Sequence, residues 1–233
     1  GEDFFTLGGP IDVYAALIPA CLATLGHLAV GPRTPAPLRT KLIDTLLERW
    51  EKAMQYEVQW SPVNVTQLTE ILGRIGASDV ATSEQRLRIA NTLARHVDEI
   101  PVLHALAGLL RRADPEPSLD RLAGSLVLRL LKRLQEDEVL TSEDRETYLR
   151  ILAKVALRGR FQIRGGDLAR LIERMVEALV SGLRQGVPGS AQHLANLRDA
   201  GVLPARHQDI VADELRRFTS VIPLDPPAGG PES

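Results

Sequence analysis

The chain contains almost no cysteine. Cys21 is the only one among 233 residues, so no disulfide can form within the chain. This pattern is typical of a reducing compartment, and we expect a cytoplasmic protein. Because Cys21 stands in an apolar run, we expect a small buried side chain rather than a reactive thiol.

An excess of either charge is also missing. The formal net charge is −2, so the whole chain has no general attraction to nucleic acid or to an acidic membrane surface. Only 4 of its 28 basic residues are lysine, and the rest are arginine. Such a bias can reflect genome composition, so an arginine-rich stretch is weak evidence of function by itself.

One uncharged run, residues 13–31, is long enough to span a bilayer. Pro19 and His27 interrupt it, and acidic rather than basic residues precede it, unlike a signal peptide. We therefore predict a buried helix, or two helices broken near Pro19, rather than a membrane segment.

The first ten residues, GEDFFTLGGP, resemble the attachment site of acyl and peptidyl carrier proteins. A carrier needs a serine two residues after the second glycine, because its hydroxyl oxygen forms the phosphodiester. Here Pro10 and Ile11 follow the glycines, so the reactive oxygen is missing. We predict instead a turn into a helix with Pro10 in the first turn and Phe4 and Phe5 packed over that helix.

Strand patterns are absent too, and helix-forming Leu, Ala and Arg are abundant. Helical spacing and capping residues predict an all-α fold of about ten helices. Their expected positions are 10–30, 37–57, 64–76, 82–97, 101–112, 118–136, 142–158, 167–185, 190–200 and 204–219. We expect one helical domain over 1–219, followed by a Pro/Gly-rich tail, 220–233, that is disordered or a linker.

Two features indicate an internal repeat. TSEQR at 82–86 recurs as TSEDR at 141–145, and in each the threonine or the serine is expected to cap a helix. The apolar positions of 118–136 also align with those of 167–185 at an offset of 49, whereas 37–57 aligns at an offset of 80. Since the offsets differ, both a true repeat and a set of independent amphipathic helices are compatible with the sequence.

Paired helices with such apolar faces resemble HEAT and armadillo repeats. The resemblance covers most of 35–219 and implies an α-solenoid whose stacked helix pairs form a concave binding face. An irregular helical bundle is the alternative architecture.

The sequence shows no pattern typical of a catalytic or metal site. It contains no H-E-x-x-H, no G-x-S-x-G and no phosphate-binding glycine loop. We therefore expect no catalytic residues, no metal and no cofactor. Asp98, Glu99 and His104 are the only candidates for acid–base chemistry if the protein is an enzyme after all.

Partner-binding candidates lie in two places. Trp60 precedes a Ser-Pro break and is a candidate anchor for a partner. The stretch 145–174 holds eight basic and three acidic residues, with a net charge of +5. Within it, Phe161 has arginines on both sides, an arrangement suited to phosphate contact and base stacking. These arginines are Arg158, Arg160 and Arg164.

The sequence thus favours a non-enzymatic helical-repeat scaffold or regulatory domain. Its expected partner is another protein, or another domain of a longer chain. The alternative is a HEAT-like nucleic-acid-binding domain that uses the basic stretch 145–174.

Overall fold

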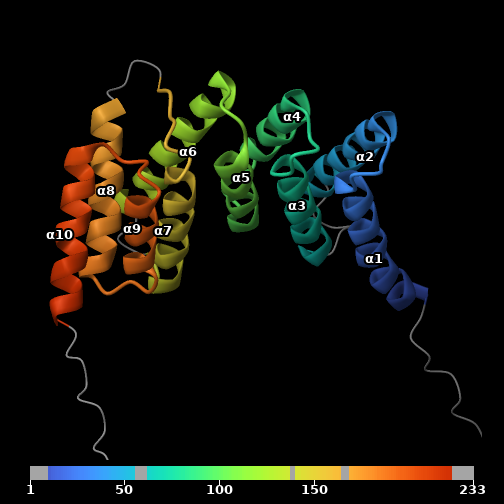
Figure 1. Ribbon diagram of the computed structural model, residues 1–233. Helices are drawn as coiled ribbons and strands as arrows, with labels where there is room; N and C mark the ends of the chain where they lie inside the picture. The colour runs from blue at the N-terminus through green and yellow to red at the C-terminus, as the bar shows by residue number, and fades with distance from the viewer. Residues whose placement is uncertain (1–9, 56–61, 137–139, 164–167, 222–233) are drawn as a thin grey trace, which may run out of the picture. The chain divides into compact units, whose positions relative to one another are not determined.

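The computed structural model describes residues 10–55, 62–136, 140–163 and 168–221 (Figure 1). Ten helices and no strand occur in these ranges, so the predicted all-α fold is confirmed. Their bounds are α1 Pro10–Val30, α2 Ala36–Gln55, α3 Pro62–Gly76, α4 Ser83–Ala94, α5 Ile100–Arg112, α6 Pro117–Glu136, α7 Ser142–Ala156, α8 Leu168–Arg184, α9 Ser190–Asp199 and α10 Ala205–Val221.

The chain divides into two compact units. Unit 1 consists of Gly1–Gly124 with Arg160–Gln162, and unit 2 of Ser125–Gly159 with Ile163–Ser233. The boundary falls inside α6, where no sequence feature marks it. The expectation of one continuous repeat domain over 1–219 stays a prediction.

In unit 1 the odd-numbered helices pack side by side. Helix α3 contacts both α1 and α5, while α2 and α4 contact each other and also pack on α3 (Figure 1). The helices of unit 1 therefore form two layers, with α1, α3 and α5 in one and α2 and α4 in the other. Buried aliphatic side chains from both layers fill the space between them.

Glycines permit the close approach of helices in the first layer. A Cβ on Gly26 of α1 would stand 2.8 Å from Cγ2 of Ile71 in α3. A Cβ on Gly73 of α3 would stand 2.8 Å from Cβ and 3.0 Å from Cα of Ala105 in α5. All three distances are shorter than ordinary van der Waals contact. A larger residue at Gly26 must displace the Ile71 side chain or the helix, and one at Gly73 must separate α3 from α5.

Three polar pairs connect α2 to α4 across the second layer. Gln85 Nε2 donates to Thr40 Oγ1 at 3.0 Å, Arg88 pairs with Asp44, and Arg95 Nη1 lies 3.6 Å from Glu51 Oε1. The members of each pair are 44 or 45 residues apart in the sequence. The two helices therefore run in the same direction and in register. This offset differs from those of 49 and 80 in the apolar pattern.

The predicted helix caps are confirmed, and the threonine rather than the serine is the capping residue in both. Thr82 Oγ1 accepts from the Gln85 N–H at 3.2 Å, and the Gln85 side chain accepts from the Thr82 N–H at 3.0 Å. Thr141 Oγ1 accepts from the Asp144 N–H at 3.1 Å. Each cap satisfies a backbone donor that the first helical turn leaves without an intrahelical partner, and so fixes where α4 and α7 begin.

Helix α1 is continuous through Pro19, and part of its surface is exposed. Cys21 is exposed, so its predicted burial is wrong. The reason is tertiary: α1 stands at one end of its layer and packs on α2 and α3, which cover only part of its circumference. Among the described residues, no helix is long and apolar enough to cross a membrane.

Unit 2 is built around α9, which contacts α7, α8 and α10 (Figure 1). An ion pair joins α8 to α10. Arg184 donates from Nε and Nη2 to the two carboxylate oxygens of Glu214 at 3.1 and 2.5 Å, and Arg217 Nη1 adds a contact of 3.2 Å. The Glu214 side chain is only 10% exposed. Its hydrogen bond with Arg184 lowers the pKa of Glu214, and the charges of Arg184 and Arg217 lower it further.

This ion pair predicts a pH-dependent stability. Because the folded-state pKa of Glu214 lies below its unfolded value of about 4.3, the pair stabilises the fold above that pH and loses its effect as the carboxylate is protonated. We expect Arg184→Gln to lower the urea midpoint at pH 7 and to have much less effect at pH 3. Arg206→Gln, an exposed change on α10, is the control. An equal loss at both pH values would contradict this role.

Candidate functional site

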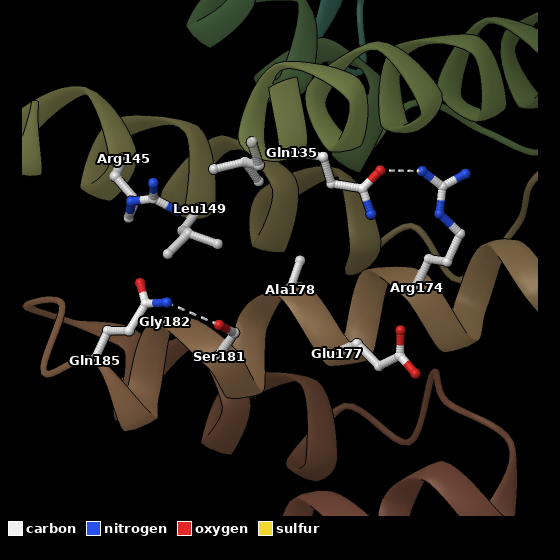
Figure 2. A pocket seen from close by; sticks show the side chains of 10 residues that line it. Gln135, Arg145, Leu149, Arg174, Glu177, Ala178, Ser181, Gly182 and Gln185 are labelled. Carbon is white, nitrogen blue, oxygen red and sulfur yellow. Dashed lines mark hydrogen bonds between the residues drawn. The ribbon is translucent and has the colours of Figure 1, made fainter. Parts of the chain in front are cut away.

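A cleft of about 220 Å³ opens in unit 2 between the end of α6, the start of α7 and one face of α8 (Figure 2). Helix α8 supplies half of the ten lining residues. The lining residues are Leu134 and Gln135 of α6, Arg145 and Leu149 of α7, and Arg174, Glu177, Ala178, Ser181, Gly182 and Gln185 along and just past α8.

The cleft exists because α8 carries small side chains on the face that meets α7. The lining positions of α8 recur every three or four residues, so they form one face of the helix. Ala178, Ser181 and Gly182 leave that face hollow. At Gly182 the two helices are in close contact, since a Cβ there would stand 2.4 Å from Cδ1 of Leu149. Leu149 is 2% exposed and contributes apolar surface to the cleft.

Two guanidinium groups lie on opposite sides of this apolar surface (Figure 2). Arg174 Nη2 donates to Gln135 Oε1 at 2.6 Å, so a neutral partner holds this guanidinium in place without cancelling its charge. In the described parts of the chain, no hydrogen bond or ion pair engages the guanidinium of Arg145. Glu177 is the single carboxylate in the lining, so positive charge dominates.

The remaining polar groups of the cleft are neutral. Gln185 Nε2 donates to Ser181 Oγ at 3.1 Å at the end of the cleft nearer Arg145 (Figure 2). With two guanidinium groups and these polar groups around an apolar floor, the cleft is suited to hold an anionic group on an otherwise apolar ligand. Arginine is the side chain that best matches the two oxygens of a carboxylate.

The residues predicted from sequence do not converge on this cleft. Trp60 and Arg164 lie outside the described residues. Arg158 is half-buried in unit 2 and has interaction partners, whereas Arg160 is exposed and belongs to unit 1. The cleft does include Arg145 and Arg174, the first and last basic residues of the stretch 145–174.

The sequence led us to expect that the Phe161 ring is presented for base stacking. The ring is instead buried, with Phe161 only 8% exposed. The cause is the path of the loop. The Gln162 N–H donates to the Asp120 carbonyl at 3.0 Å. A Cβ on Gly124 would stand only 2.5 Å from the Gln162 carbonyl oxygen. The loop thus packs closely on the first half of α6 within unit 1.

The structure does not support an acid–base site at the three candidate residues. Asp98 and Glu99 are exposed, His104 is half-buried, and Asp98 and His104 each have interaction partners. No group of three or more metal-ligating side chains occurs in the part of the chain that the structure describes.

Sequence reasoning missed the small residues that make the cleft. The sequence did contain a signal for it: the small residues Ala178, Ser181 and Gly182 recur at helical spacing on one face of a strongly amphipathic helix. That signal could be interpreted only once α7 was known to lie against this face.

Comparisons of the chain with protein-family models, with curated proteins and with solved structures give no match. The functional argument therefore rests on the geometry of this chain alone.

Proposed function

We propose that the chain is a non-enzymatic helical-repeat domain that binds another protein, or another domain of a longer chain. The observation that carries the proposal is the two-layered packing of unit 1, with α2 and α4 parallel and in register at a spacing of 44 or 45 residues. Stacked helix pairs of this kind, as in HEAT and armadillo proteins, present long helix faces to partners.

The second support is the cleft of unit 2. It combines apolar surface with arginine, and arginine is enriched where proteins bind one another.

The single cysteine is exposed, and a free exposed thiol is compatible with a reducing compartment such as the cytoplasm.

A nucleic-acid-binding role is the second candidate. The exposure of Arg160 favours it, as does the surplus of basic residues in 145–174. The burial of Phe161 weakens it, because base stacking on this ring was part of the predicted site. In this role the pair of changes Arg158→Ala and Arg160→Ala would weaken binding, and affinity would fall steeply with salt.

Capture on the purified chain separates these two functions. The chain is incubated with lysate of its source cells, with and without nuclease, at low and moderate salt. We expect a discrete protein to be retained after nuclease treatment and at moderate salt. Loss of all retained material on nuclease treatment would contradict the protein-binding role and support the nucleic-acid role. Trp60→Ala, in the same assay, tests whether that tryptophan anchors the partner.

A further inference from the structure

We propose that the cleft of unit 2 binds an acidic side chain from a short extended peptide segment of a partner protein, with Arg145 and Arg174 as the residues that select it. This inference rests on the proposed protein-binding function and adds the site and the chemistry of the ligand.

The charges of the cleft indicate an anionic group. The lining contains two arginines and one carboxylate, and the partner of Arg174 within the chain is the neutral side chain of Gln135. A ligand carboxylate can therefore be paired without displacing an existing ion pair. Hydrogen bonds between guanidinium and carboxylate groups are among the strongest that proteins make, and their paired geometry gives selectivity.

The dimensions of the cleft indicate a peptide segment. The lining extends along α8 from Arg174 to Gln185, just past the end of the helix. These positions are eleven residues apart, which is about 16 Å at the rise per residue of an α-helix. An extended chain covers that length in about five residues. The volume of about 220 Å³ is smaller than that of typical small-molecule sites, roughly 300–1,000 Å³, and suits one or two side chains.

The floor of the cleft favours protein over nucleic acid. Leu134, Leu149 and Ala178 give it apolar surface, and none of the lining residues is aromatic. Proteins that hold single-stranded nucleic acid combine a long basic groove with aromatic rings on which bases stack. An apolar floor between two guanidinium groups matches instead an acidic residue with small apolar neighbours.

The test uses the full chain and an array of immobilised pentapeptides. Each peptide has a central Glu or Asp between Ala, Val or Leu residues, and each is matched by a peptide with central Gln or Asn. We expect the wild-type chain to prefer the acidic peptides. The double variant Arg145→Gln with Arg174→Gln should bind them about tenfold more weakly or worse.

Two further variants control for charge and folding. Arg198→Gln with Arg206→Gln removes the same charge from exposed positions of unit 2 outside the cleft, and should bind like the wild type. Ser181→Glu places a carboxylate in the cleft at an exposed helical position, and should block acidic peptides while helix content by circular dichroism is unchanged.

Each other outcome overturns the proposal in a distinguishable way. No preference for acidic peptides, or an equal loss in both double variants, removes the cleft as an acidic-peptide site. If the lysate protein is still retained by Arg145→Gln with Arg174→Gln, the protein-binding function stands and only the cleft assignment fails. Binding of a 20-nucleotide single strand that this double variant loses would assign the cleft to nucleic acid.

Discussion

Gly73→Val is expected to destabilise unit 1 by about 3 kcal/mol, because α3 and α5 have no room for a side chain where they cross. A Cβ at Gly73 would stand 2.8 Å from the Ala105 Cβ, 3.0 Å from its Cα and 3.2 Å from its carbonyl oxygen. Two of these atoms belong to the backbone, so a change of side-chain rotamer cannot relieve the overlap. The helices must move apart.

This loss should exceed the gain in helix propensity that accompanies removal of a glycine, about 1 kcal/mol at most. Amide hydrogen exchange followed by mass spectrometry is the appropriate measurement, since it reports the units separately. We expect faster exchange in α3 and α5, with α8 to α10 unchanged. Ala20→Val, which enlarges an exposed residue of α1, is the control. Unchanged protection in α3 and α5 would contradict the close crossing.

Trp50→Ala is expected to cost about 3–5 kcal/mol, the usual range for removing a large aromatic side chain from a core. Trp50 is 0% exposed. Its Nε1 donates to Thr69 Oγ1 at 2.7 Å, and its ring packs in a T-shaped arrangement with the His96 ring at a centroid distance of 5.1 Å. This single side chain therefore joins α2 to α3 and to the segment that follows α4.

The smaller changes Trp50→Phe and Thr69→Val separate the contribution of packing from that of the hydrogen bond. Trp50→Phe keeps an aromatic ring but removes the donor to Thr69, and should cost less than Trp50→Ala. The Thr69 hydroxyl also donates to the Val65 carbonyl at 2.8 Å, so it keeps one partner in this variant. In a double-mutant cycle with Thr69→Val, we expect a coupling of about 0.5–1.5 kcal/mol in urea unfolding. Additive losses would show that the hydrogen bond contributes nothing measurable.

Local features of the fold could be predicted from the sequence. The ten helices start and end within about three residues of their predicted positions, because Thr82 and Thr141 cap helices and apolar residues recur with helical spacing. The burial of Trp50 follows from the same helical spacing, since this residue lies on the apolar face of its helix.

Features that depend on which helices are neighbours could not be predicted. Cys21 stands in an apolar run yet is exposed, because α1 ends its layer. Phe161 has arginines around it in sequence yet is buried, because its loop packs on α6. The cleft needs α6, α7 and α8 together, so no single segment reveals it. Arg145 and Arg174 were counted among the basic residues of the stretch 145–174, but no sequence feature distinguished them from the others.

Site-specific photo-crosslinking tests the central claim most directly. A benzophenone side chain replaces Ser181 in the cleft, or Gln192 on the exposed face of α9 as the control, and the chain is irradiated in lysate. The assignment of the cleft as an acidic-peptide site, which rests on the proposed function, predicts a crosslink from position 181 to a protein segment that contains Glu or Asp, and its loss when Arg145 and Arg174 are changed to Gln. Crosslinks to nucleic acid, or protein crosslinks from position 192 alone, would contradict it.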